Sequence, residues 1–368
     1  MKKTYISYIG TILLVVVWSA LAATAWLKPS QALSEAERRP LAQFPEISTA
    51  NLLNGSFMTY FEDYTLDQFP LRDGFRQVKS QFHFNVLQQK DNNDIYIADG
   101  YAAQLEYPLN ETSVSNAIRK FNWIYENYLA NMDSRIIFSI VPDKGYYLAE
   151  QNGYPTMDYD SMFTAMQTGL SWADHVDLTD CLTLQDYYRT DTHWRQEALL
   201  PAAEKLCQAL DVSAPEAGDY IQTALDTPFY GVYYGQAALP LEPETVYTME
   251  SDLLNTCIVT NFETGKRTII YDRSKLTSPD LYDIYLSGAT ALLTIENPMA
   301  STDRELIVFR DSFGSSMIPL LLQDYKTVTV VDIRYISSLL LPQHISFQGQ
   351  DILFLYSTLV LNNSSTLK

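Results

Sequence analysis

The chain has 368 residues, of which 47% are hydrophobic and 19% charged, so it can bury a sizeable core in one large or two modest domains and is not intrinsically disordered. Lys and Arg total 25 against 44 Asp and Glu, and the net charge of −19 repels phosphate backbones and anionic lipid. We therefore do not expect nucleic acid as a partner.

The N-terminal stretch is long and apolar enough to cross a membrane. The 23 uncharged residues Tyr5–Leu27 would span roughly 34 Å as a helix at ~1.5 Å per residue, more than a hydrocarbon core of about 30 Å. Lys2 and Lys3 favour a cytoplasmic start, so we expect a single-pass cell-membrane protein with an extracellular main domain. A cleaved signal peptide is the alternative, because Ala23 and Ala25 form a small-residue cleavage site.

Three regions follow along the chain. We predict a membrane anchor or signal segment at 1–28, a connector with short helices at 29–91, and the main domain at 92–368. The prolines and charges of "SEAERRPLAQFPEIS" suit an extended connector. After it, apolar residues at mixed helical spacing predict two short helices, interrupted at Pro70.

The main domain alternates strands and helices. Predicted helices occupy 111–131, 195–210 and 314–322, and predicted strands occupy 135–142, 175–179, 305–309, 327–333 and 351–357. This order is typical of an α/β domain with a mostly parallel sheet and helices on both faces. Residues 212–300 do not follow this alternation of strands and helices, and we expect a loop-rich insertion there.

The cysteines favour neither a disulfide framework nor a metal site. A bridge between Cys181 and Cys207 is conceivable outside the cell, but Cys257 would then stay unpaired. We expect three buried free thiols. The chain has no C-x-x-C and only four histidines, so a Cys/His metal site is not expected.

A serine stands at a reactive position in "ELIVFRDSFGSSMIPLLL". Ser312 lies between an apolar strand and a helix, at the sheet edge where α/β ligand sites gather. The helix start offers unpaired backbone N–H groups that can stabilise an oxyanion near Phe313, and Gly314 permits a close backbone approach. The alternative is that Ser312 only caps the helix.

A second stretch, "YYRTDTHWRQEA", supplies a possible base. In an extended segment Asp191 and His193 point to the same side, so the carboxylate can hold Nδ1–H and leave Nε2 free to take a serine proton. Trp194 would face away as packing or as a wall of the site. The alternative is a polar helix N-terminus with Asp191 near the cap.

These motifs resemble a known family. "DTHW" at 191–194 and "RDSF" at 310–313, behind an N-terminal anchor, resemble the bacterial DHHW proteins, which are related to the SGNH-hydrolase-like proteins of alginate O-acetylation. The resemblance extends through "QFPLRDGFRQVKS", "VPDKGYYL" and "DLYDIYLSG" and covers most of 34–357. It implies an SGNH-hydrolase-like fold, with the acid and histidine preceding the serine.

The resemblance also implies roles for individual residues. Ser312 would be the nucleophile, His193 the general base and Asp191 its orienting group. The sequence departs from the family pattern at three positions: Thr192 replaces a histidine, Arg310 stands where GDS-type blocks carry Gly, and Ala289 stands where we would look for an Asn-like oxyanion donor.

Four further residues are candidates for binding substrate. Lys144 matches the family's "VPxK" and could hold a sugar or acyl carbonyl, although it could equally form a solvated turn with Asp143. The other candidates are Arg310, Trp194 and Tyr188. The segment "FYGVYYG" at 229–235 is the best candidate for a loop that faces a glycan.

Together these features predict an exported, membrane-anchored O-acetyltransferase or acetylesterase acting on a cell-surface polysaccharide, with no cofactor. The related systems imply a membrane-bound acyltransferase partner as acetyl donor. The main alternative is a glycan-binding or assembly protein of the cell envelope that does little chemistry, since fold does not fix function. A metal-dependent hydrolase using His193 would need more ligands than lie nearby in the sequence.

Overall fold

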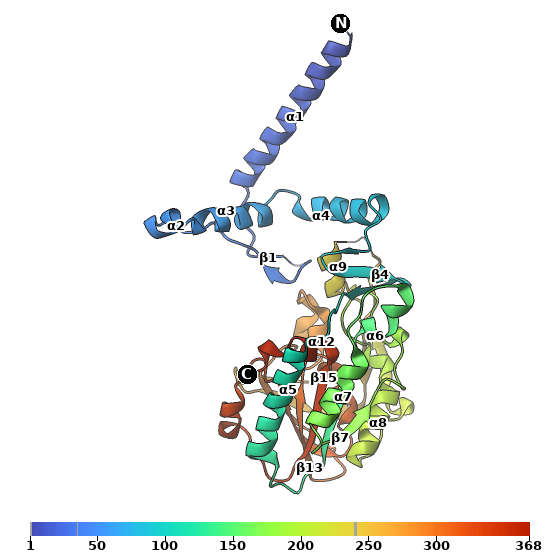
Figure 1. The fold of residues 1–368 in the computed structure, drawn as a ribbon. Coiled ribbons are helices and arrows are strands. Elements are labelled where there is room, and N and C mark those ends of the chain that lie inside the picture. Colours follow the sequence, from blue (N-terminus) through green and yellow to red (C-terminus); the bar gives the residue numbers. More distant parts are fainter. Residues whose placement is uncertain (1, 35, 239–240) are drawn as a thin grey trace. The chain divides into compact units, whose positions relative to one another are not determined.

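The computed structural model describes residues 2–34, 36–238 and 241–368 (Figure 1). It divides into two compact units, which we call the N-terminal unit (Met1–Asn92 with Gly235–Pro240) and the α/β unit (Asn93–Tyr234 with Leu241–Lys368). Each unit is considered by itself.

The N-terminal unit begins with the apolar helix α1 (Lys2–Leu27). Within the part of the chain that the structure describes, residues Tyr8–Leu27 form the one helix long and apolar enough to cross a membrane, and none of it is buried. A short antiparallel pair and three helices follow, one helix more than predicted: β1 (Leu33–Ser34), β2 (Arg39–Pro40), α2 (Thr49–Leu53), α3 (Ser56–Asp67) and α4 (Arg72–Gln81). A π-helical turn, Phe82–Val86, extends α4.

The α/β unit is built on an eight-stranded sheet in the order β11-β10-β12-β14-β13-β15-β6-β7. Its parallel part comprises β14 (Tyr325–Val331), β13 (Arg304–Arg310), β15 (Asp351–Ser357), β6 (Ile136–Val141) and β7 (Asp174–Asp177). Three antiparallel strands extend it: β12 (Leu292–Glu296), β10 (Ile258–Asn261) and β11 (Arg267–Thr268). The predicted α/β class with a mostly parallel sheet is confirmed.

Helices cover both faces of this sheet. On one face α5 (Glu111–Ile124), α7 (Tyr159–Gly169) and α12 (Thr358–Asn362) pack against alternate strand residues such as Ile307 and Phe309, and Figure 1 shows α5 and α7 in front of the strands. On the other face α8 (Leu200–Leu210) and α11 (Gly314–Met317) cover Leu306 and Val308. Because both faces are buried at the centre of the sheet, β6, β13 and β15 carry continuous apolar runs rather than an alternating pattern.

Smaller elements complete the described chain. They are the hairpin β4 (Ile95–Ala98) and β5 (Tyr101–Gln104), α6 (Lys144–Leu148), the pair β8 (Ile221–Ala224) and β9 (Tyr247–Glu250), the two-residue strand β3 (Asp91–Asn92), α9 (Val232–Ala237) and α10 (Asp252–Thr256).

Three sequence predictions need correction. The region 212–300 is not merely a loop-rich insertion, because β10, β11 and β12 lie in the main sheet. The helix predicted from 195 begins at Leu200, after a 3₁₀ turn and next to Pro201, which favours a helix start. The helix predicted at 314–322 divides into α11 and a 3₁₀ turn that contains Pro319.

The three cysteines are free, as expected. Cys207 and Cys257 are buried, but Cys181 is only partly buried.

Candidate active site

The serine of "RDSF" lies where the parallel strands end. β13 ends at Arg310, and α11 begins at Gly314, so Ser312 occupies the tight connection at the carboxyl edge of the sheet. Its neighbours Asp311 and Phe313 are buried, whereas Ser312 is half-buried. Ser312 is therefore the partly exposed residue of this turn.

A chain of hydrogen bonds joins Ser312 to "DTHW". His193 Nε2 lies 2.8 Å from Ser312 Oγ, and His193 Nδ1 lies 2.6 Å from Asp191 Oδ1. A carboxylate only accepts hydrogen bonds, so Nδ1 carries the proton and Nε2 is left to accept one from the serine hydroxyl. Asp191 is fully buried and His193 is 6% exposed. The three side chains thus have the geometry of a serine nucleophile with an oriented base.

The segment Phe229–Tyr234 holds the acid in place. Asp191 Oδ2 accepts a hydrogen bond of 2.8 Å from the Val232 backbone N–H, and the backbone N–H of Gly231 donates to Thr190 Oγ1 at 3.1 Å. A Cβ on Gly231 would lie 2.1 Å from the Thr190 carbonyl oxygen, so this approach requires glycine. The segment 229–235, predicted to face a glycan, thus also supports Asp191; Phe229 is buried, whereas Tyr230 is exposed.

An unpredicted tyrosine flanks the base. The ring of Tyr282 stacks on the His193 imidazole with centroids 3.9 Å apart and planes at 8°. Its hydroxyl lies 2.7 Å from Ser316 Oγ, which also accepts a hydrogen bond of 2.9 Å from Trp194 Nε1. Burial raises the pKa of Tyr282, so it stays a neutral hydrogen-bonding group. The sequence signal was the "DLYDIYLSG" motif, which carried no assigned role.

A second unpredicted residue shapes the serine turn. Asp311 Oδ1 accepts a hydrogen bond of 3.0 Å from the Phe313 N–H, and Oδ2 accepts from the backbone N–H and hydroxyl of Ser357 at 2.7 and 2.6 Å. Asp311 therefore ties the turn to the end of β15. No side chain caps α11, whose first flanking residue is Phe313, so the capping alternative for Ser312 is wrong.

This arrangement changes the expected oxyanion donor. The Phe313 N–H already donates to Asp311, and the Gly314 N–H donates to the Asp311 carbonyl at 3.1 Å. Among the residues that the structure describes, no acceptor bonds the Ser312 N–H. The backbone N–H of the serine itself is thus the donor that remains available for a developing oxyanion.

Arg310 supports the turn from the interior. It is fully buried, its guanidinium donates to the carbonyls of Asp311 and Gly288 at 3.2 and 3.3 Å, and it lies 3.7 Å from Asp332. Burial lowers its pKa, but the Asp332 carboxylate favours the charged form. A Cβ on Gly314 would lie 2.8 Å from the Arg310 Cβ, so the following glycine makes room for it.

Lys144 is not on the surface either. It is 2% exposed, and its Nζ donates to the carbonyls of Tyr188 at 2.9 Å, Arg189 at 3.2 Å and Ala102. The ammonium also lies 4.9 Å from the centroid of the Tyr233 ring. Burial lowers the pKa of Lys144 to about 7. The lysine therefore fastens the backbone that leads into "DTHW", and the alternative of a solvated turn is also wrong.

The four residues predicted to bind substrate thus lie in the interior of the α/β unit. Tyr188 and Trp194 are fully buried, like Arg310, and Trp194 packs beneath the serine turn by donating to the Phe313 carbonyl at 3.0 Å. A side chain without exposed surface offers nothing to a dissolved substrate. We therefore assign these residues to positioning rather than to substrate binding. Within the described residues, no cluster of His, Cys, Asp or Glu could hold a metal ion.

The chain resembles known proteins in its sequence motifs and in its fold. The DHHW protein family model matches residues 180–331, a range that contains both "DTHW" and "RDSF", and the predicted resemblance is confirmed. A DHHW family protein from Eubacterium siraeum has a similar structure, with a TM-score of 0.62 and 20% identity over 75% of this chain and 95% of that chain.

PatB1 from Bacillus cereus is similar with a TM-score of 0.59 and 17% identity over 73% of this chain and 96% of its own. The structure of PatB1 with a sulfonyl adduct has a TM-score of 0.56 and 17% identity, over 73% of this chain and 95% of that chain. The search of curated proteins found no match. These likenesses support the same fold.

Proposed function

We propose that this chain is an exported, membrane-anchored enzyme that transfers or removes O-acetyl groups on a cell-surface polysaccharide. The observation that carries the proposal is the chain of hydrogen bonds from Asp191 through His193 to the half-buried Ser312. A serine hydroxyl is a weak nucleophile at neutral pH, and an adjacent oriented histidine is the usual means of activating it.

In the first half of the reaction, Ser312 Oγ forms a bond to the carbonyl carbon of the acetyl ester while its proton passes to His193 Nε2. The carbonyl oxygen becomes an oxyanion, which the Ser312 N–H stabilises. The tetrahedral intermediate collapses, the bond to the leaving alcohol breaks, and the proton on His193 moves to that alcohol oxygen. Ser312 is left acetylated, while the carboxylate of Asp191 holds the imidazolium in place.

In the second half, a hydroxyl group attacks the acetyl-serine and His193 takes its proton. Water as acceptor gives acetate and makes the chain an esterase. A sugar hydroxyl gives a new acetyl ester and makes it a transferase. In both cases the last step returns the proton from His193 to Ser312, so no oxidant, metal or cofactor enters the balance.

Three observations support this reaction class and location. PatB1, which shares the fold, has been solved with a sulfonyl adduct, and sulfonyl groups typically modify activated nucleophiles. The DHHW resemblance links the motifs to polysaccharide acetylation. The apolar helix α1, preceded by two lysines, fits a single membrane span with the α/β unit outside the cell. A membrane-bound acyltransferase would then supply the acetyl group from the other side.

Hydrolysis of 4-nitrophenyl acetate by the full chain tests the proposal. Ser312→Ala and His193→Ala should each lower kcat/KM about 10³-fold or more, with circular dichroism unchanged. Ser346→Ala and His344→Ala are matched controls, because both residues are exposed and neither is in the site. Full activity in a folded Ser312→Ala variant would exclude the mechanism. An inactive wild type that retains polysaccharide binding would favour the glycan-binding alternative.

A further inference from the structure

Helix α4 carries its apolar residues on the outside. Leu71, at its start, and Phe75, Val78 and Phe82 recur at intervals of four, three and four, which places them on one helical face. They are 74%, 49%, 67% and 49% exposed, respectively. In a water-soluble protein this face would be turned toward the core.

The opposite face of α4 is polar and bound to the protein. Arg72 and Arg76 form ion pairs with Glu37 at 2.5 and 3.2 Å, and Arg76 also donates to the Gly235 carbonyl at 2.8 Å. Ser80 is fully buried and donates to the Ala237 carbonyl at 2.7 Å. Because these contacts hold the polar side inward, α4 cannot turn its apolar side inward without breaking all of them.

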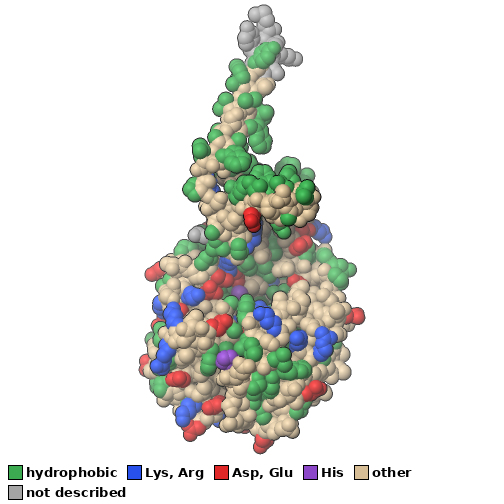
Figure 2. All heavy atoms as spheres, turned by 90° about the vertical axis from the view of Figure 1, so that its left-hand side faces the viewer, with side chains coloured by type: hydrophobic (Ala, Val, Ile, Leu, Met, Phe, Trp, Pro, Cys, Tyr) green, Lys and Arg blue, Asp and Glu red, His purple; other side chains and the backbone are tan. Residues whose placement is uncertain are grey.

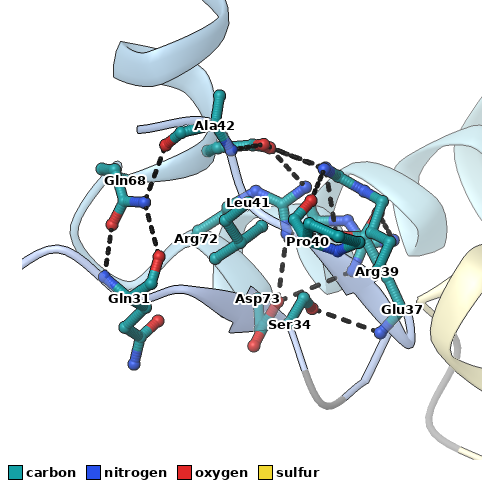
Figure 3. A network of polar contacts seen from close by, with 12 residues as sticks. Gln31, Ser34, Glu37, Arg39, Pro40, Leu41, Ala42, Gln68, Arg72 and Asp73 are labelled. Carbon is teal, nitrogen blue, oxygen red and sulfur yellow. Dashed lines mark hydrogen bonds and ion pairs between the residues drawn. The ribbon is translucent and has the colours of Figure 1, made fainter. Parts of the chain in front are cut away.

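Hydrogen bonds connect the chain that follows α1 to the junction of α3 and α4. The backbone N–H of Gln31 donates to Gln68 Oε1, and Gln68 Nε2 donates to the Gln31 carbonyl, both at 2.9 Å (Figure 3). Gln68 directly follows α3 and lies three residues before Leu71, whereas Gln31 lies four residues after Leu27. Four residues span at most roughly 14 Å, so the junction of α3 and α4 is held close to the point where the chain leaves the bilayer.

The charge of this segment suits a position at a lipid surface. Residues 28–92 carry seven Lys and Arg against eight Asp and Glu, whereas residues 93–368 carry 16 against 36. The acidic excess that repels anionic lipid is thus confined to the α/β unit. Residues 28–92 are nearly neutral, so anionic lipid headgroups would repel this segment only weakly.

Helices α2 and α3 add to the exposed apolar surface, and Figure 2 shows hydrophobic side chains gathered over this part of the N-terminal unit. The exposed large apolar residues between β2 and α4 are Phe44, Ile47, Leu52, Leu53, Met58, Tyr60 and Leu66. A patch of this kind marks an interaction surface rather than ordinary scatter.

We propose that the apolar face of α4, formed by Leu71, Phe75, Val78 and Phe82, lies in the headgroup–acyl boundary of the bilayer that α1 crosses. Amphipathic helices bind membranes in this in-plane manner. The occupant of the face is lipid, because the contact through Gln31 and Gln68 holds α4 beside the bilayer. This inference depends on α1 lying in the membrane and is independent of the acetyl chemistry.

Nitroxide labels on the full chain in phosphatidylcholine vesicles test the inference. The three native cysteines are replaced by alanine, and a single cysteine is placed either at Val78 or at Gln77. Gln77 is the matched control, because it is exposed on the same helix but points away from the apolar face. Collisions with oxygen, which partitions into lipid, are compared with collisions with a water-soluble nickel chelate.

We expect the oxygen-to-nickel collision ratio at Val78 to exceed that at Gln77 several-fold. Equal, water-like ratios at the two positions would overturn the inference, since no other partner is present in these vesicles. A label at Val78 whose spectrum broadens with protein density, without an excess of oxygen collisions, would instead show contact with a second copy and would also overturn it. Circular dichroism verifies that each labelled chain is folded.

Discussion

Helices α8 and α4 have nearly the same length, but α8 buries its apolar face, whereas α4 buries its polar face. In α8, Leu206 and Leu210 are fully buried against the sheet, while polar residues such as Glu204 face water. In α4, Ser80 is buried and Val78 is exposed. Both helices are amphipathic, so periodicity alone does not tell which face is buried. The difference shows that the polar contacts of a helix decide which of its faces is buried.

Truncating the apolar face of each helix tests this contrast most strongly. Leu206→Ala should lower the free energy of unfolding by about 2–5 kcal/mol, because it leaves a cavity beneath α8. Phe75→Ala in detergent should change it by less than about 0.5 kcal/mol, because its side chain is already half exposed. Urea unfolding followed by tryptophan fluorescence measures both. A large loss for Phe75→Ala would mean that this face packs against protein.

Changing the polar face of α4 should have the next largest effect. Arg76→Met leaves the Gly235 carbonyl without its donor and should lower the stability of the N-terminal unit by about 1–3 kcal/mol. Arg119→Met, at an exposed arginine on α5, is the control and should be nearly neutral. Limited proteolysis of the segment after α1 reports on the N-terminal unit. If both variants resist cleavage equally, the polar face of α4 does not hold the helix in place.

The α/β unit buries a lysine, Lys144, whose charge in the folded chain depends on pH. The folded pKa of Lys144, about 7, lies below the ordinary value of 10.5, so between these pH values the unfolded chain binds one more proton. Stability contributed by this group therefore rises with pH across that window, by up to about 1.4 kcal/mol per pH unit. Urea unfolding at pH 7.5, 8.5 and 9.5 should show this rise relative to Lys144→Met. Parallel pH curves would contradict it.

The smallest effect concerns the base. Tyr282→Leu removes the ring stacked on His193 and should lower kcat about fivefold, since such ring contacts contribute roughly 1 kcal/mol. Tyr282→Phe keeps the ring and should stay within about twofold of the wild type. An equal loss in both would assign the effect to the hydrogen bond with Ser316 instead. The pH profile of kcat distinguishes positioning of His193 from simple destabilisation.

The elements of the α/β unit could be predicted largely because its strands are buried on both faces. The apolar runs of β6 and β15 are short and rich in β-branched or aromatic residues, which favours buried strands over helices. The strands β10, β11 and β12 were missed because they join the sheet antiparallel from a region with tyrosines, glycines and charges. Their place depends on pairing between residues far apart, which local periodicity does not contain.

For the candidate site, spacing was informative and burial was not. Asp191 and His193 were paired on the assumption of an extended segment, but residues 189–193 form bends, and the pair meets in a turn in which the His193 N–H donates to Asp191 Oδ1 at 3.1 Å. Ser312 could be singled out because a turn follows an apolar strand. Lys144, Arg310, Trp194 and Tyr188 were candidates for binding substrate, but all four side chains are buried, and for Trp194 the alternative of packing is the one that the structure has. Lys144 and Arg310 bind backbone carbonyls, Arg310 also lies near the Asp332 carboxylate, and Trp194 binds the Ser316 hydroxyl. These partners are far away in the sequence, so no local pattern predicts them.

The two buried thiols affect how the chain withstands an oxidising environment. Burial raises the pKa of Cys207 and of Cys257 to about 12. At pH 7 only about one thiol in 10⁵ would then be the reactive thiolate. Neither of these two thiols is therefore poised to exchange with another chain's disulfide, and Cys181, which is only partly buried, is the thiol that remains accessible.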